Sequence, residues 1–173
     1  MQYRIETQRL RLRELQREDF DALCPFLQDI NVMYACEYAF SDEQVREFIS
    51  NQQKRYQADG FGYYAAEEKA SGKVVGCMGP LMEQIDGEKF YGIGYILGLD
   101  AWGKGYATEA GEACIQYLFE NYPAQKVIAE IRPENQASVR VAERLGMKKE
   151  SQFIKMVNGK QMPHAIYARY AEQ

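Results

Sequence analysis

The sequence has little of what a metal site or a cysteine enzyme needs. Its 173 residues contain one histidine, His164, and four cysteines that lie far apart without a CxxC pair. Zinc sites and Cys-His catalytic pairs need several such groups at suitable spacing, so we predict no metal site and regard a cysteine nucleophile as disfavoured. The cysteines are expected to be reduced and to serve as small core residues.

Long apolar runs and an excess of positive charge are also missing. No stretch approaches the ~20 apolar residues that cross a membrane, and residues 1–6 are polar and charged, unlike a signal peptide. The 21 Lys and Arg residues are outnumbered by 25 Asp and Glu, which argues against a protein that mainly binds nucleic acid. We therefore expect a cytoplasmic protein with no membrane or nucleic-acid partner.

What is present is the composition of a globular protein, 46% hydrophobic and 27% charged. The chain contains no internal repeat, low-complexity tract or Pro/Ser-rich linker. We therefore predict that residues 1–173 form a single domain.

Hydrophobic periodicity divides the chain into alternating strands and helices. A capping-box signature at residues 41–44 and a closing glycine at Gly60 bound the second helix, and Asp86-Gly87 and Asn158-Gly159 predict hairpin turns. The predicted strands cover residues 9–15, 61–67, 73–82, 89–97, 126–131, 152–157 and 164–170. The predicted helices cover residues 17–29, 41–60, 104–121 and 136–145.

This order, β-α-α-β-β-β-α-β-α-β-β, predicts an α/β or α+β fold with one central sheet. Three consecutive strands between residues 61 and 97 form an antiparallel meander, so the sheet is mixed and mainly antiparallel. We expect about seven strands flanked by about four helices.

The stretch WGKGYATEA, residues 102–110, places two glycines at the junction between a strand and a helix. Free N–H groups at a helix N-terminus bind anions, and glycines let a ligand approach the backbone. The spacing does not fit a P-loop, and Thr108 stands where the third glycine of a dinucleotide fingerprint belongs. A turn with close packing between helix and sheet is the structural alternative, and the glycines alone do not decide between it and an anion site.

The motif WGKGYATEA resembles the pyrophosphate-binding motif of the GNAT acyltransferases. Thr7–Arg13 (TQRLRLR) followed by Glu18-Asp19 resembles the opening of the branch typified by ribosomal-protein N-terminal acetyltransferases. Further matches to that branch, in order and spacing, are Gly94-Tyr95, Asn135-x-x-Ser138 and Arg144–Met147. The resemblance covers nearly the whole chain.

The resemblance implies that acetyl-CoA is the co-substrate and that no metal is needed. It places the pantetheine arm beside the fourth predicted strand and the pyrophosphate on the N-terminus of the following helix. The implied binding residues are Leu97 and Leu99 through their main chain, and Gly103, Lys104, Gly105, Tyr106, Ala107, Thr108, Asn135 and Ser138. Asp100 departs from the broader family, which often has Gln or Arg three residues before the first glycine.

Acyl transfer to an amine needs a group that accepts the amine's proton and a donor for the departing thiolate. Glu130, five residues before Asn135, resembles the glutamate that one group of N-terminal acetyltransferases uses as a base. Ser138 is implied to steady the leaving sulfur, and Tyr167 on the last predicted strand is a substitute acid. Two positions differ from the family pattern and argue for caution about the catalytic roles. Gly92 replaces an acid that many relatives carry, and Ala142 replaces the tyrosine that often donates the proton to the thiolate.

These residues imply an N-acetyltransferase that transfers acetyl directly to a primary amine, either a peptide N-terminus or a small molecule. We look for acceptor specificity in residues 31–40 and 83–89, which are aromatic and acidic. Gly92 and Ala142 motivate an alternative, a catalytically weak acyl-CoA-binding module that regulates a partner. The sequence leaves a monomer and a homodimer open.

Overall fold

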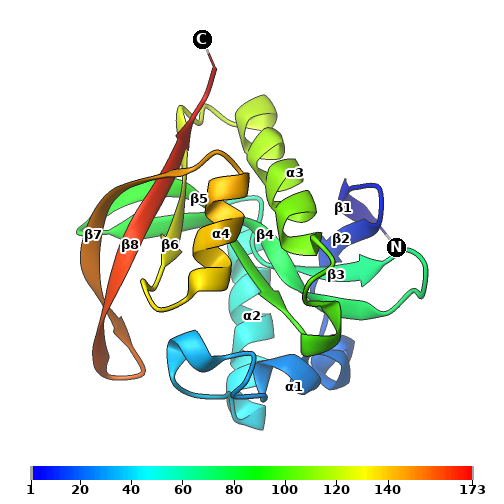
Figure 1. Ribbon diagram of the computed structural model, residues 1–173. Coiled ribbons are helices and arrows are strands. Elements are labelled where there is room, and N and C mark those ends of the chain that lie inside the picture. Colours follow the sequence, from blue (N-terminus) through cyan, green and yellow to red (C-terminus); the bar gives the residue numbers. More distant parts are fainter. Residues whose placement is uncertain (1, 173) are drawn as a thin grey trace.

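Eight strands and four α-helices make up the part of the chain that the computed structural model describes, residues 2–172 (Figure 1). The strands are β1 Tyr3–Glu6, β2 Leu10–Glu14, β3 Tyr64–Glu68, β4 Val74–Ile85, β5 Glu88–Leu97, β6 Lys126–Ile131, β7 Lys148–Val157 and β8 Lys160–Tyr170. The helices are α1 Phe20–Leu27, α2 Asp42–Ala58, α3 Tyr106–Asn121 and α4 Gln136–Arg144, with short 3-10 turns at Arg17–Asp19, Tyr34–Cys36 and Leu99–Ala101.

All of these strands join one sheet in the order β1-β2-β3-β4-β5-β6-β8-β7. Every neighbouring pair is antiparallel except β5 and β6, so the predicted mixed, mainly antiparallel sheet is confirmed. The expected count of about seven strands is one too low. The missed strand β1 has a single buried residue, Ile5, and therefore shows no alternation from which the sequence could have indicated it.

The helices cover both faces of the sheet (Figure 1). Helices α1 and α2 pack Leu23, Val45 and Ile49 on a core that includes Ala65 and Cys77 of the sheet. Helices α3 and α4 belong to the larger core, which contains the buried side chains Ala110, Cys114, Ile115, Leu118 and Ala142. The sheet is therefore the middle of three layers.

The parallel strands β5 and β6 separate soon after they meet. Their register contains only Tyr91 opposite Val127 and Gly92 opposite Ile128, yet β5 continues to Leu97 and β6 to Ile131. The backbone groups beyond Gly92 on β5 and Ile128 on β6 are thus not paired with each other. This divergence opens the sheet at its centre.

Two charged clusters explain the arginine-rich opening of the sequence. Glu109 in the first turn of α3 accepts hydrogen bonds from Thr7 Oγ1 at 2.6 Å, and from the backbone N and Nε of Arg9 at 2.9 and 2.8 Å. The guanidinium of Arg13 binds Asp19 through two bonds of 2.8 and 2.9 Å, and both side chains are less than 10% exposed. The first cluster holds the start of α3 against the β1–β2 turn.

Candidate active site

A cavity of about 670 Å³ lies where β5 and β6 diverge. Its wall continues from residues 93–97 of β5 to the start of α3, and from residues 129–132 to the first turns of α4. Residues 32–36, between α1 and α2, close the opposite end. This volume lies in the range of small-molecule and cofactor pockets.

The glycine pair forms the N-terminus of α3 at one end of this cavity. Gly103 and Gly105 have φ angles of 76° and 80°, which strain any other residue, and Gly105 is the N-cap. No side chain caps this helix, so its first backbone N–H groups are free of intrahelical partners and face solvent or a ligand. A Cβ added to Gly103 would meet no atom within 4 Å, so close packing does not exclude a side chain there. Glycine is favoured at this position because of the positive φ angle of the backbone.

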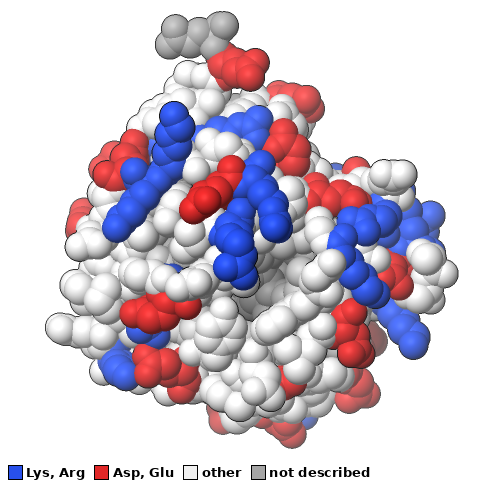
Figure 2. Space-filling view, viewed as in Figure 1, with Lys and Arg blue, Asp and Glu red and all other residues white. Residues whose placement is uncertain are grey.

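Basic side chains lie along the upper and right-hand rim of the hollow on the molecular surface (Figure 2). Arg140 and Arg144 line the cavity from α4, and Arg9 and Lys104 flank Tyr106 at 4.5 and 5.9 Å from its ring centre. Positive charge together with an open helix N-terminus suits a phosphorylated ligand. Arg140 was not predicted from the sequence, although its spacing of four residues from Arg144 places both side chains on one helix face.

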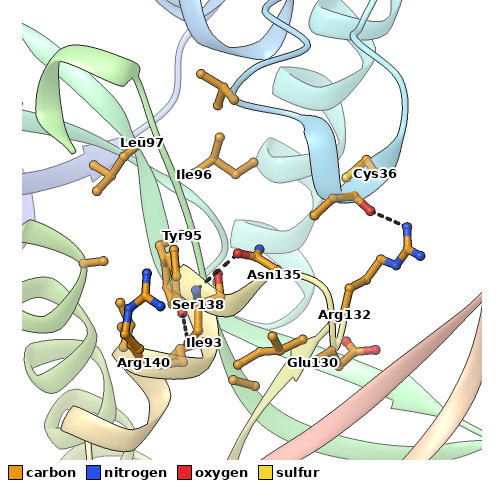
Figure 3. A pocket seen from close by; sticks show the side chains of 18 of the residues that line it. Cys36, Ile93, Tyr95, Ile96, Leu97, Glu130, Arg132, Asn135, Ser138 and Arg140 are labelled. Atoms are coloured by element: carbon orange, nitrogen blue, oxygen red, sulfur yellow. Dashed lines mark hydrogen bonds between the residues drawn. The ribbon is translucent and has the colours of Figure 1, made fainter. Parts of the chain in front are cut away.

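The start of α4 forms another wall of the same cavity (Figure 3). Asn135 caps the helix by accepting a hydrogen bond from the Ser138 backbone N at 3.2 Å, and it also accepts one from the Tyr34 hydroxyl at 2.7 Å. The Tyr95 hydroxyl donates to the Ser138 carbonyl at 3.2 Å. The Asn135-x-x-Ser138 motif is therefore fixed to both β5 and the loop before α2.

The cavity lining includes most of the residues selected from sequence. Leu99, Lys104 and Tyr167 are outside it. Leu99 lies in the turn before the glycines with 42% of its surface exposed, and Tyr167 lines a second, shallower hollow on the other side of α4. The residues that the structure brings together are Leu97, Gly103, Gly105, Tyr106, Ala107, Thr108, Glu130, Asn135 and Ser138.

Two carboxyl groups line the cavity near the point where β5 and β6 diverge. The Glu130 side chain is 8% exposed, and its Oε1 lies 3.5 Å from the Lys155 Nζ. The Glu83 carboxyl, from β4, lies within hydrogen-bonding reach of Glu130. Burial, with Glu130 as the next cause, raises the pKa of Glu83 to about 8.

The same end contains groups that hold the loop before α2 in place. Glu37 has a φ of 60° and binds both Arg132 Nη1 and Lys160 Nζ at 2.7 Å. Arg132 also donates to the Ala35 carbonyl at 3.0 Å. The loop that closes the cavity is therefore tied to the end of β6 and to the start of β8.

Comparison with known proteins agrees with this geometry. Residues 9–148 match the family described as "Acetyltransferase (GNAT) domain". The chain belongs to the GNAT acetyltransferase family. It is an enzyme by that membership, and acetyl transfer from acetyl-CoA is the reaction that the membership supports.

Relatives of this GNAT chain cover nearly its whole length. The uncharacterized N-acetyltransferase YnaD of Bacillus subtilis is 32% identical and covers 88% of this chain and 87% of its own. A GNAT-family acetyltransferase of Bacillus anthracis has a TM-score of 0.80 at 27% identity, covering 96% and 97%. The ribosomal L7/L12 α-N-protein acetyltransferase RimL, solved with coenzyme A, has a TM-score of 0.76 at 21% identity, covering 95% of each chain. The expected resemblance to ribosomal-protein acetyltransferases is thus confirmed for the fold.

Two features are absent from residues 2–172. Within that range, no helix has the length and apolar character needed to cross a membrane. No group of three or more His, Cys, Asp or Glu side chains is placed to hold a metal ion in the same part of the chain.

Proposed function

We propose that this GNAT enzyme transfers the acetyl group of acetyl-CoA directly to a primary amine while both substrates are bound. The observation that carries the proposal is the continuity of one cavity, which runs from the open N-terminus of α3 to the Glu83–Glu130 carboxyl pair. Its two ends differ in charge, so each suits a different substrate. A donor phosphate group and an acceptor ammonium can therefore occupy the cavity together.

The residues at the donor end fit acetyl-CoA. The first-turn N–H groups of α3 and the guanidinium groups of Arg140 and Arg144 would hold its phosphates. The Leu97 backbone would flank the pantetheine arm where β5 has left β6. The Leu97 carbonyl now accepts a 2.9 Å hydrogen bond from Trp102 Nε1, and the pantetheine amide would share or replace this bond.

Direct transfer is favoured over a covalent acetyl-cysteine. Cys36 is the cysteine that lines the cavity among the described residues, and burial raises the pKa of its thiol. A thiol with a raised pKa is protonated near neutral pH and is a poor nucleophile. Burial likewise raises the pKa of Cys114, to about 12, and that residue lies in the core.

The acceptor end supports a primary amine as the second substrate. Carboxylate groups attract an ammonium ion and can take its proton, which an amine must lose before it attacks a thioester. The neighbouring wall, formed by residues 32–36 with Tyr63 and His164, supplies apolar and aromatic contact. A peptide N-terminus and a small-molecule amine both meet this description, and RimL, by its name, acetylates the α-amine of a ribosomal protein.

The test is a thiol-release assay with acetyl-CoA against peptides with different N-terminal residues, polyamines, aminoglycosides and free amino acids. Release of CoA with one class supports the enzyme and identifies its acceptor. Tight binding of acetyl-CoA without release on any acceptor would instead support the alternative, an acyl-CoA-binding regulatory module, for which Gly92 and Ala142 are the motivating departures. Absence of acetyl-CoA binding would contradict both.

A further inference from the structure

Glu83 fills the space beside Gly92. Strands β4 and β5 pair with Glu83 opposite Phe90 and Leu81 opposite Gly92, so the side chains of Glu83 and of any residue at position 92 share one face of the sheet. A Cβ on Gly92 would lie 3.0 Å from the Glu83 Cγ and 3.1 Å from the Ile128 carbonyl oxygen. Glycine at position 92 is therefore what allows the Glu83 side chain to cross β5 toward β6.

Gly94, two residues further along β5, repeats this arrangement on the same face. A Cβ there would collide with the Tyr63 hydroxyl and with Leu81 Cδ1, 2.7 Å away. The paired glycines thus leave room for one carboxyl and one phenol from neighbouring segments. Both Glu83 and Tyr63 line the cavity, at the level where β5 and β6 diverge.

Glu130 reaches this place from the other side of the opening. It follows Ile128 by two residues on β6, just past the last paired residues of β5 and β6. The Glu83 carboxyl lies within hydrogen-bonding reach of it, and Lys155 of β7 lies 3.5 Å from Glu130. Two carboxyl groups so close together cannot both be ionised without a large energetic cost, and Glu83, whose pKa is raised by burial and by Glu130, is the one that holds a proton at neutral pH.

We propose that Glu83 and Glu130 act as one proton-accepting pair for the ammonium group of the acceptor, with Glu83 supplying from β4 the carboxyl group that Gly92 does not supply on β5. The inference rests on the proposed acetyl transfer. Glu83 thereby becomes a catalytic residue, and the absence of an acid at position 92 no longer argues for a weak enzyme.

The proton balance of the step is complete with these groups. The acceptor ammonium loses two protons on the way to the amide. The first passes to the ionised pair and frees the amine, whose nitrogen then forms the amide C–N bond as the thioester C–S bond breaks. The second proton passes from that nitrogen to the departing sulfur, which takes the C–S bonding electron pair and leaves as CoA thiol. An acceptor amine has an ordinary pKa of ~8 to ~10.4, so a base whose pKa is about 8 is well matched to it.

Other titratable and charged groups face the pair from each element packed against it. They are Arg55 of α2, Cys36 and Tyr63 from the loops before α2 and β3, Lys155 of β7 and His164 of β8. Lys155 and Arg55 lower the pKa of Glu83, but burial and Glu130 outweigh them. The Tyr63 hydroxyl stays protonated, because burial and Glu83 raise its pKa.

The expected pH dependence follows from this balance. The accepting form of the pair accumulates as the pH rises through about 8, so kcat at saturating substrates rises over the same range. In Glu83→Gln, Glu130 loses its partner carboxyl and keeps Lys155, so this step in the kcat profile disappears. The loss of a general base lowers kcat by about 100-fold.

Because the two groups act as a unit, their effects on kcat do not add. We expect the double variant Glu83→Gln/Glu130→Gln to have a kcat no lower than that of the slower single variant.

The experiment combines pH profiles of kcat with 13C NMR titration of the glutamate side-chain carboxyl carbons in the free enzyme. The matched control is Glu120→Gln, at an exposed position near the end of α3. We expect one carboxyl titration near pH 8 in the wild type and the control, and none there in Glu83→Gln. In Glu130→Gln the titration moves to lower pH but stays above the ordinary glutamate range, because burial is the larger cause of the raised pKa.

Absence of any carboxyl titration above about pH 6 in the wild type would overturn the pair. An unchanged kcat profile in folded Glu83→Gln would overturn its catalytic role. A wild type that shows the titration but releases no CoA with any amine would overturn the proposed function instead, since the NMR measurement does not depend on turnover.

Discussion

The Glu83 side chain lies over Gly92, its neighbour on the next strand, so that a Cβ on the glycine would stand 3.0 Å from the Glu83 Cγ. Position 92, where the family resemblance implies an acid, is thus covered by an acid from another strand. In the proposed mechanism, this carboxyl group from β4 forms part of the proton acceptor. This relationship leads to a direct test by exchange of positions.

Moving the carboxyl group back to β5 should restore part of the activity. Glu83→Ala removes the proton acceptor and the nearer of the two obstructions beside Gly92, and the Ile128 carbonyl oxygen remains 3.1 Å from a Cβ there. We expect kcat/KM to fall about 100-fold in this variant. Adding Gly92→Glu to Glu83→Ala returns a carboxyl group to the same space and recovers about tenfold of that loss, measured by thiol release. The control, Gly92→Gln in the same background, lacks the proton acceptor. Equal rates for the Glu and Gln versions would contradict the assignment.

Gly105→Ala should weaken donor binding. Alanine at a φ of 80° is strained by roughly 1–2 kcal/mol, and relief of this strain disturbs the N–H groups that begin α3. We expect the dissociation constant for acetyl-CoA, measured by calorimetry, to rise about tenfold, a loss of roughly 1.4 kcal/mol. Gly72→Ala is the matched control, because Gly72 has a φ of 73° in a turn outside the cavity lining. Similar affinities in the two variants would show that α3 does not bind the donor.

Glu37→Gln should loosen the closed end of the cavity. This change breaks the contacts with Arg132 and Lys160, but exposed ion pairs contribute little, so the effect is modest. We expect KM for bulky amine acceptors to fall about two- to threefold while KM for small ones stays constant. Glu43→Gln, an exposed change in the first turn of α2, is the control. A uniform change for all acceptors would contradict a gating role.

The contacts of Glu37 should not contribute to the pH profile near 8. Lys160 and Arg132 lower the pKa of Glu37 below its ordinary value of ~4.3. A carboxylate with a lowered pKa keeps its contacts above that ordinary value and loses them only as the pH falls through the lowered one. The Glu37 contacts are therefore constant between pH 6 and 9. Acceptor KM ratios measured across this range should be flat.

Asp19→Ala should destabilise the fold without altering the cavity. The substitution leaves the buried guanidinium of Arg13 with one carboxylate, Glu67 at 2.5 Å, and with the Glu14 carbonyl at 3.2 Å. Loss of one charged partner from a buried ion pair costs about 3 kcal/mol. Urea unfolding monitored by circular dichroism measures this change. Asp21→Ala, at an exposed position two residues later, should cost about 0.5 kcal/mol. Equal stabilities of the two variants would contradict a structural role for the Arg13 cluster.

The sequence predicted the cavity-lining residues at helix N-termini better than the meeting of Glu83 with Glu130, for a physical reason. Gly103, Gly105, Asn135 and Ser138 shape the local backbone at the starts of helices, and such positions leave signatures in a short stretch of sequence. The capping box at Ser41 and the closing Gly60 were predictable for the same reason and are confirmed.

Residues that act across strands were harder to foresee. The contact of Glu83 with Glu130 depends on the β4–β5 register and on where β5 leaves β6, and neither follows from local pattern. Tyr167 was predicted on the correct strand, but which side of α4 its side chain faces depends on how α4 packs against the sheet. In the structure Tyr167 lines the second hollow instead of the main cavity. Ala142 is buried in the core, so the structure provides no proton donor at that position.

The most direct test of the central claim is to follow the label when isotopically labelled acetyl-CoA reacts with the acceptor found in the thiol-release panel. The account predicts that mass spectrometry finds the label in an amide of the acceptor, with one CoA released per acetylated amine. It also predicts that the enzyme mixed with acetyl-CoA alone carries no label on any cysteine. Labelled enzyme, or CoA binding without an acetylated product, would contradict direct transfer in this cavity.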